Sequence, residues 1–254
     1  MKNDKCKTTR VGKRGTLFSF RELEGLETCV YLIEGPRHAF VIDTFLGPKS
    51  MDIVKKRLAR ALRDKPAVVV NTHFHWDHVW GNCAFPGSPV VAHESCRAKI
   101  GRVGEKELKA HGSMQQGNVK LVLPNCTFTD RLVYEDDEVE LFRSPGHSPD
   151  SISVHDRRDR VLLVGDNVEE PLPYLYSTDL AAYERTLESY LSLGAQRIIA
   201  GHCARVTRGT IKGNLAYVRA FRNGGTGKYD KGQFRQTHRQ NLRVMELLRK
   251  KRNT

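Results

Sequence analysis

The chain has 254 residues, of which 39% are hydrophobic and 28% are charged, and its formal net charge is +13. This composition is typical of a globular protein, and no apolar run approaches the roughly 20 residues that a membrane-spanning helix needs, so we expect no membrane association. The N-terminus is basic and lacks the apolar segment of a secretory signal, which predicts a cytoplasmic protein. The length suits one large α/β domain.

The positive charge is concentrated at the two ends of the chain. Residues 1–14 contain six Lys/Arg and one acid, residues 205–254 contain fourteen and two, and the stretch between them carries −4. A basic end can attract phosphates or nucleic acid in a salt-dependent manner. It can equally be a solvated helix face without any partner, and the sequence leaves both interpretations open.

The first half of the chain reads as strands followed by a helix. Residues 16–20, 28–33 and 39–42 are β-rich runs separated by turns, which predicts an antiparallel meander. From residue 50 to 63 apolar residues recur every three or four positions, and this spacing predicts an amphipathic helix. The run 67–70, Ala-Val-Val-Val, has the length and the β-branched content of a buried strand.

The second half continues to alternate between strands and helices. His93-Glu94 is a candidate helix start, whereas residues 101–118, rich in Gly, Lys and Gln, are interpreted as a mobile loop. The periodicity predicts strands at 89–92, 119–123, 131–134, 139–142, 151–155, 161–164 and 197–200, and helices at 178–193, 211–222 and 234–251.

The six residues from His73 to His78, His-Phe-His-Trp-Asp-His, place four metal-binding groups directly after a predicted strand. In an extended backbone His73, His75 and Asp77 point to one side while His78 begins to turn away. That geometry can serve one metal ion or two adjacent ions. The alternative is a polar loop whose histidines cap a helix, but three histidines and an aspartate within six positions favour metal binding.

Three later positions deliver residues of the same kind at strand ends or turns. His147 lies in the rigid loop Ser-Pro-Gly-His-Ser-Pro-Asp, Asp166 follows a glycine after the strand 161–164, and His202 follows a glycine after the strand 197–200. Asp150 at the end of the loop is either a group that orients a ligand histidine or a plain turn residue. Cys203, beside His202, is interpreted as a small core residue, and all six cysteines as reduced thiols.

This order of motifs resembles the metallo-β-lactamase superfamily of hydrolases over about residues 16–205. The resemblance implies an α/β four-layer αββα sandwich, in which two β-sheets pack face to face, helices cover both outer faces and the metals lie at one edge. It implies a single hydrolase domain over residues 1–254, with a core at about 16–205 and a basic helical C-terminal extension at about 206–254.

The resemblance also implies a dinuclear site with two divalent metal ions, for which zinc is the first choice and iron or manganese are alternatives. A hydroxide bridging the ions would be the nucleophile, and Asp77 would orient it and pass a proton. By similarity the first ion would be held by His73, His75 and His147, the second by Asp77, His78 and His202, and both by a bridging Asp166.

Aspartate at position 166 resembles the thioesterase, lactonase and RNA-processing branches more than the dedicated β-lactamases. We therefore predict cleavage of a small-molecule ester, lactone or thioester in a glyoxalase II-like or lactonase-like branch, with weak β-lactamase or phosphodiesterase side activity. Glutathione is not assigned, because the family's tyrosine after the last metal histidine is not evident after His202. Tyr174 and Tyr176 are candidate substrate-binding residues, since a phenol can donate a hydrogen bond to a developing oxyanion.

A ribonuclease or phosphodiesterase that holds nucleic acid through the basic C-terminal region is the alternative function. Against it, the chain lacks room for substrate-clamping domains, and the basic region has few interleaved aromatic residues. A metal-binding scaffold without turnover is disfavoured because no ligand position is missing. Either a monomer or a homodimer is compatible with the sequence.

Overall fold

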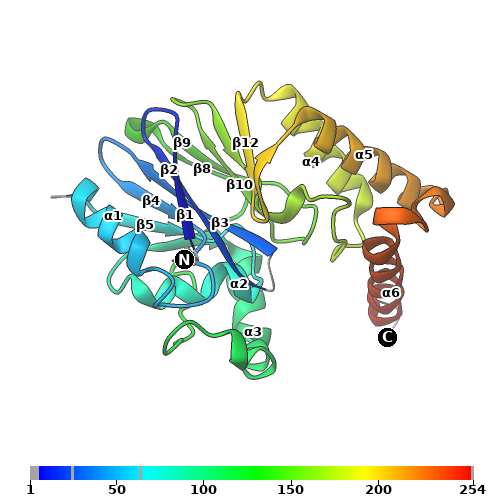
Figure 1. The fold of residues 1–254 in the computed structure, drawn as a ribbon, viewed down its shortest axis with the longest axis horizontal. Helices are drawn as coiled ribbons and strands as arrows, with labels where there is room; N and C mark the ends of the chain where they lie inside the picture. The colour runs from blue at the N-terminus through cyan, green and yellow to red at the C-terminus, as the bar shows by residue number, and fades with distance from the viewer. Residues whose placement is uncertain (1–5, 24–25, 63–64, 253–254) are drawn as a thin grey trace, which may run out of the picture.

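Two β-sheets lie face to face with helices on both outer sides in the computed structural model, which describes residues 6–23, 26–62 and 65–252 (Figure 1). This arrangement confirms the predicted four-layer αββα sandwich with a C-terminal helical segment. Part of the basic N-terminal run, residues 1–5, and the end of the helix predicted at 50–63 lie outside the described residues. Within the described part of the chain, no helix combines the length and apolarity needed to cross a bilayer.

The first sheet combines an antiparallel meander with a parallel half. Its strands from β1 to β4 pair antiparallel, and those from β4 to β7 pair parallel. The parallel half includes the crossover helices α1 (Asp52–Leu62), α2 (Trp76–Val79) and α3 (Glu94–Ala110). In spatial order the strands are β1 (Cys6–Val11), β2 (Gly15–Leu23), β3 (Leu26–Glu34), β4 (Ala39–Ile42), β5 (Ala67–Val70), β6 (Val90–His93) and β7 (Cys126–Phe128).

The second sheet has one parallel pair, β11 with β12, joined through α4 (Leu180–Ser192). Two further helices follow the last strand: α5 (Arg208–Arg222) lies beside α4, and α6 (Arg235–Arg252) runs away from them toward the C-terminus (Figure 1). In spatial order the strands are β13 (Cys203–Val206), β12 (Arg197–Ala200), β11 (Val161–Leu163), β10 (Ile152–Asp156), β9 (Val139–Arg143) and β8 (Arg131–Tyr134). The connections include the 3₁₀ helices η1 (Trp80–Ala84), η2 (Gly112–Met114), η3 (Glu135–Asp137), η4 (Gly165–Asn167), η5 (Gly227–Tyr229) and η6 (Gly232–Phe234).

The alternation of side chains along the strands fills two different cores. Leu17 and Tyr31 of the first sheet point inward, where they belong to one buried cluster with Leu141 of the second sheet. Their neighbours Phe18 and Leu32 point to the other face, where they belong to a buried cluster with the apolar side of α1. Because side chains alternate with a period of two, each strand serves both layers, and the sandwich follows from the pattern.

The structure corrects the interpretation of residues 101–118 as a loop, because α3 continues through residue 110. A Cβ on Gly104 would lie 2.8 Å from a methyl group of Leu121, so this glycine allows the chain after α3 to pack closely on the helix. The strand predicted at 119–123 is also absent. Val119 and Leu121 instead pack against the cluster that includes Ile100 of α3, so their alternation reflects contact with a helix.

The extended geometry expected for residues 73–77 is wrong as well. The chain turns after β5 and enters α2 at Trp76, so Asp77 and His78 lie on a helical turn, and His73 and His75 lie on the bend before it. The cluster is therefore built from a bend and a helix. The strands β5, β11 and β12 are followed by His73, Asp166 and His202 within a few residues, which places these side chains together at one edge of the sandwich.

Candidate metal centre

The seven residues expected to bind metal come together at that edge. They form two groups. Within each group every side chain offers one ligand atom, and these atoms all lie within 4.8 Å of one another. His75 and His202 are partly exposed, and the other members are buried, so the groups lie at the inner end of a surface opening. The first group is His73, His75, His147 and Asp166, and the second is Asp77, His78 and His202.

The first group brings three imidazoles together edge to face, with interplanar angles of 80–86°. His75 Nδ1 lies 3.0 Å from His73 Nε2 and 3.1 Å from His147 Nε2. Burial lowers the pKa of His75 to about 3 and holds the pKa of His73 well below its usual range. These two imidazoles are therefore neutral at physiological pH, which is the form that binds a metal ion.

The second group combines one carboxylate with two imidazoles. His202 Nε2 lies 3.3 Å from Asp77 Oδ2, and His78 Nε2 lies 3.6 Å from the same oxygen. Burial by itself lowers the pKa of both histidines, but the carboxylates around them outweigh burial and raise the pKa well above its ordinary value. When protonated, these imidazoles balance the negative charge of the neighbouring carboxylates. A bound cation would provide that charge compensation instead.

Asp166 lies between the two groups. Its Oδ2 is 3.3 Å from Nε2 of both His78 and His202, 3.5 Å from that of His73 and 3.8 Å from that of His147. Burial raises the pKa of Asp166, yet the surrounding imidazoles hold it well below its usual range. Among the residues that the structure describes, the buried Asp166 Oδ1 and His78 Nε2 atoms have no hydrogen-bond partner, and both face a donor set that fits divalent ions.

The ring nitrogens on the far side of the imidazoles are held by acceptors or hydroxyls. His78 Nδ1 faces Asp43 Oδ2 at 2.9 Å, and His147 Nδ1 faces the Tyr174 carbonyl oxygen at 3.1 Å. His202 Nδ1 lies 3.0 Å from the carbonyl oxygen of Glu27. An acceptor on one ring nitrogen selects the tautomer whose lone pair is on the other, so these contacts aim the free nitrogens at the centre.

Two acidic residues beside the site were missed by the sequence interpretation. Asp43 has φ 60°, uncommon for a non-glycine residue, and its Oδ1 accepts the Thr72 backbone N–H at 2.8 Å. Its position after β4 is a strand end like the others, and that signal could have identified it. Glu169 Oε1 lies 3.3 Å from His147 Nδ1, and burial raises the pKa of Glu169; the sequence around it carried no signal.

Asp150 acts on the backbone of the site instead of on a histidine side chain. Its buried carboxylate contacts Ser148 and accepts a hydrogen bond from the backbone N–H of Phe74, which lies between His73 and His75. Burial raises the pKa of Asp150. The residue therefore helps to hold the bend that carries two of the imidazoles.

Glycine at position 201 is required by the close packing behind the site. A Cβ there would lie 2.1 Å from Asp166 Oδ1 and 2.7 Å from His78 Cε1. Both distances are far shorter than any ordinary van der Waals contact. Only a residue without a side chain lets the turn after β12 pass this close to the two groups.

A cavity of about 540 Å³ opens over the cluster. Tyr176 packs edge-on against His75 and His147, with ring centroids 5.0 and 5.1 Å away. Its hydroxyl also hydrogen-bonds Gln240 of α6. The lining residues include Leu26, Trp76, Asp77, Tyr174, Tyr176, Cys203, Gln236 and Thr237.

Comparisons with known proteins agree with this geometry. The family model described as the metallo-beta-lactamase superfamily matches residues 24–202. Bovine (Bos taurus) acyl-coenzyme A thioesterase MBLAC2 is 28% identical over 202 residues, which are 68% of this chain and 72% of that protein. The putative transcription factor avaE of Aspergillus versicolor is 29% identical over 134 residues, 48% of this chain and 39% of that protein.

Solved structures show the same fold. A metallo-beta-lactamase from Pontibacter korlensis superposes with a TM-score of 0.67 at 18% identity, covering 84% of this chain and 99% of that one. At this identity the likeness concerns the fold alone. The match over residues 24–202, the sandwich and the His/Asp cluster establish that the chain is a hydrolase that belongs to the metallo-β-lactamase superfamily.

Proposed function

We propose that this hydrolase cleaves thioesters of small molecules, within the broader class of esters, lactones and thioesters. The observation that carries the proposal is the buried His/Asp cluster at the floor of a cavity of about 540 Å³. The relatives named acyl-coenzyme A thioesterases, from cattle, human and chicken, support the thioester over the other two bonds. Glutathione is not proposed, because a cysteine follows His202.

The cluster is proposed to hold two divalent ions. His73, His75 and His147 would bind one ion, Asp77, His78 and His202 the other, and Asp166, whose Oδ2 lies between the groups, would bridge them. Bound there, the ions would supply an activated water and polarise the acyl carbonyl. Imidazole and carboxylate ligands suit zinc first, and iron and manganese next.

Asp77 is proposed as the residue that moves the proton. Its carboxylate lines the cavity, and although burial raises its pKa, neighbouring His78 and His202 lower it to about 2. The group is therefore ionised and can accept a proton as water adds to the thioester carbonyl. When the carbon–sulfur bond breaks, that proton passes to the leaving thiolate, and the products are a carboxylic acid and a thiol.

Tyr174 and Tyr176 are proposed to contact the substrate. Both are partly exposed on the cavity wall, and the backbone N–H of Tyr176 donates to the carbonyl of His147 at 2.8 Å. The loop that carries them is therefore fixed to a cluster residue, and a phenol on a fixed loop can orient an acyl group. Burial raises the pKa of the Tyr176 hydroxyl, which stays a hydrogen-bond donor at neutral pH.

The C-terminal segment is proposed to be part of one domain over residues 1–254. Asn241 of α6 donates to the Pro173 carbonyl at 2.8 Å and accepts the Leu175 backbone N–H at 3.0 Å. This pair of hydrogen bonds joins the helix to the loop that carries Tyr174 and Tyr176. The basic extension therefore shapes the cavity, while the metal ligands come from the preceding core.

The decisive experiment compares substrates on metal-reconstituted protein. Elemental analysis should find about two ions per chain, and kcat/KM should be highest for an acyl-coenzyme A among matched thioester, lactone, β-lactam and phosphodiester substrates. Asp77→Asn should reduce turnover by roughly 10²- to 10⁴-fold, the range of general acid–base catalysis. The control is Asp52→Asn, the same substitution at an exposed position of α1, which should change nothing.

Two results would contradict the proposal. Faster cleavage of the phosphodiester than of any thioester would favour the nuclease alternative. Full thioesterase activity in Asp77→Asn would remove that residue from proton transfer while leaving the metal site in place.

A further inference from the structure

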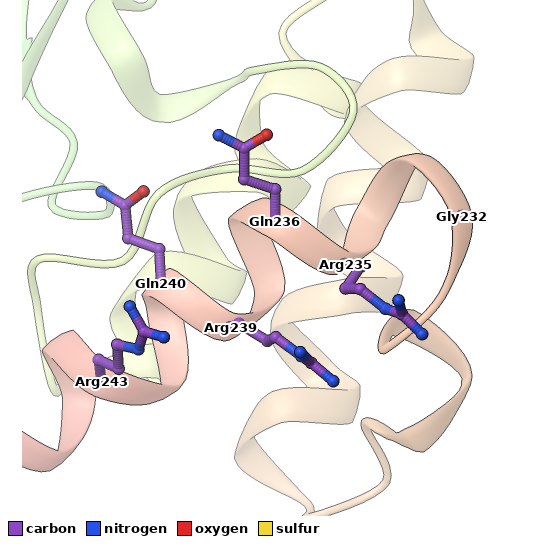
Figure 2. Close-up of a pocket in the computed structure, with 6 residues that line it drawn as sticks. All are labelled: Gly232, Arg235, Gln236, Arg239, Gln240 and Arg243. Atoms are coloured by element: carbon purple, nitrogen blue, oxygen red, sulfur yellow. The ribbon is translucent and has the colours of Figure 1, made fainter.

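A row of arginines lines a second cavity on the outer side of α6. This cavity has a volume of about 520 Å³. Arg235, Arg239 and Arg243 are spaced four residues apart, so they lie along one side of the helix, and all three are exposed (Figure 2). The complete lining is Gly232, Arg235, Gln236, Arg239, Gln240 and Arg243, which we call the arginine groove.

The positive charge of the arginine groove is only partly compensated. Asp230 accepts hydrogen bonds from Arg239 at 2.7 and 3.2 Å, and its carboxylate lies 3.9 Å from Arg235. Arg243 makes no hydrogen bond or ion pair to any described residue. One carboxylate thus compensates two of the three guanidinium groups, and all three side chains are exposed.

The arginine groove shares a wall with the cavity over the candidate metal centre. Gln236 lines both, and Gln240 in the groove hydrogen-bonds Tyr176 in the cavity. Figure 2 shows Gln236 and Gln240 pointing from α6 toward the neighbouring loop, while Arg235 and Arg239 point away from that loop. From Gln236 to Arg243 the helix rises by about 10 Å, so a ligand that leaves the cavity along α6 meets the guanidinium groups next.

We propose that the arginine groove binds the phosphate groups of a thioester substrate whose acyl end lies at the metal centre. The substrate class is an acyl thioester of a phosphorylated carrier such as coenzyme A, and this inference rests on the proposed function. Guanidinium groups bind phosphate through paired, charge-assisted hydrogen bonds. The flexible arm between sulfur and phosphates would lead from the cavity past Gln236, which lines both cavities, to the guanidinium groups.

The lining favours this ligand over nucleic acid. Strands of RNA or DNA are usually held by aromatic side chains on which bases stack, next to a basic surface. The six residues of the groove are arginine, glutamine and glycine only. They can hold phosphates and polar groups, and they offer no ring for stacking.

The test measures calorimetric binding of coenzyme A and of pantetheine, which has the same thiol and arm but neither the phosphates nor the adenosine, to metal-loaded protein. Coenzyme A should bind more tightly, and Arg243→Gln or Arg239→Gln should weaken its binding by roughly 10- to 100-fold without changing pantetheine binding. The matched control is Arg249→Gln, which removes the same charge from α6 at a residue that lines a different pocket. Asp230→Asn should tighten coenzyme A binding, because it releases Arg239 from its carboxylate.

The kinetic test distinguishes failure of this inference from failure of the proposed function. The groove variants should lower kcat/KM for acyl-coenzyme A and leave that for acyl-pantetheine unchanged. If acyl-pantetheine is cleaved as fast as acyl-coenzyme A and the variants change neither, the groove is not a phosphate site, although the enzyme is a thioesterase. If neither thioester is cleaved, the proposed function itself fails.

Two binding results would also overturn the inference. An equal loss of coenzyme A affinity in Arg249→Gln would reveal a general effect of charge. Tighter binding of a single-stranded RNA oligonucleotide at the same salt, lost in Arg243→Gln, would assign the groove to nucleic acid.

Discussion

Replacing Gly201 by alanine should damage the metal centre while leaving the fold in place. The added Cβ would lie 2.1 Å from Asp166 Oδ1 and 2.7 Å from His78 Cε1, so the carboxylate must move by about 1 Å to reach a normal contact distance. A displacement of this size at a reacting centre costs roughly 10²-fold in rate. Because Asp166 faces both groups of ligand candidates, we also expect weaker binding of the two proposed ions, by roughly 10- to 100-fold.

The assay for Gly201→Ala combines metal titration, thermal melting of the metal-free protein and kcat/KM with a thioester. The control is Gly213→Ala on α5, where an added Cβ meets nothing within 4 Å and alanine should stabilise the helix by up to about 1 kcal/mol. If Gly201→Ala binds two ions and turns over like the unchanged protein, the close approach of the turn after β12 is not what positions Asp166. A metal-free Gly201→Ala that melts far below the Gly213→Ala control would point to global misfolding instead.

Three further predictions concern the surroundings of the site and the interior of the sandwich. Asp43→Asn should weaken metal binding by roughly 10- to 100-fold in a metal titration. The Asp43 carboxylate lies 2.9 Å from His78 Nδ1, and an amide in its place no longer selects the tautomer with a free Nε2. Asp156→Ala should lower the free energy of unfolding by about 3–5 kcal/mol in urea titrations, because it leaves the buried Arg14 guanidinium, 2.6 Å from Asp156 Oδ1, without its partner. Removing metal with a chelator should abolish turnover and lower the melting temperature, since an ion at a hundred times its Kd stabilises the folded state by about 2.7 kcal/mol.

Each of these has an outcome that would contradict it. Unchanged metal affinity in Asp43→Asn would show that the His78 tautomer is set elsewhere. The double variant Arg14→Met/Asp156→Leu should recover most of the stability lost in Asp156→Ala, and equal instability of both would mean that packing, not the unpaired charge, is responsible. Turnover that persists in chelated, metal-free protein would remove the ions from the reaction.

The ligand candidates could be predicted from the sequence because their signal is local and chemical. His73, Asp166 and His202 are metal-binding residue types that directly follow apolar strands, and strands of one sandwich end at shared edges. Asp43 follows a strand in the same way, but a single aspartate before a Gly-Pro turn looks like an ordinary turn residue. Glu169 has no pattern around it, and its contact with His147 exists only once the chain has folded.

The errors in the fold have a common cause, which is that tertiary contacts override local preference. Glycines at 101 and 104 lower helix propensity, yet Gly104 is the residue on which Leu121 packs closely, so the helix α3 persists there. Apolar side chains do alternate in residues 119–123, but they pack against a helix instead of a neighbouring strand. Neither contact can be deduced from spacing, because the partner lies far away along the chain.

The hydrogen bonds between Asn241 and the loop at 173–175 join two parts of the site that could change independently in evolution. The ligand candidates are complete by residue 202, whereas α6 enters the cavity wall afterwards and is joined to it through the amide side chains of Asn241 and Gln240. A new helix that kept an asparagine at this place could present different side chains beside the same reaction. Substrate choice could thus diverge among related sequences, or be redesigned, by exchanging a single terminal segment while the ligand residues stay unchanged.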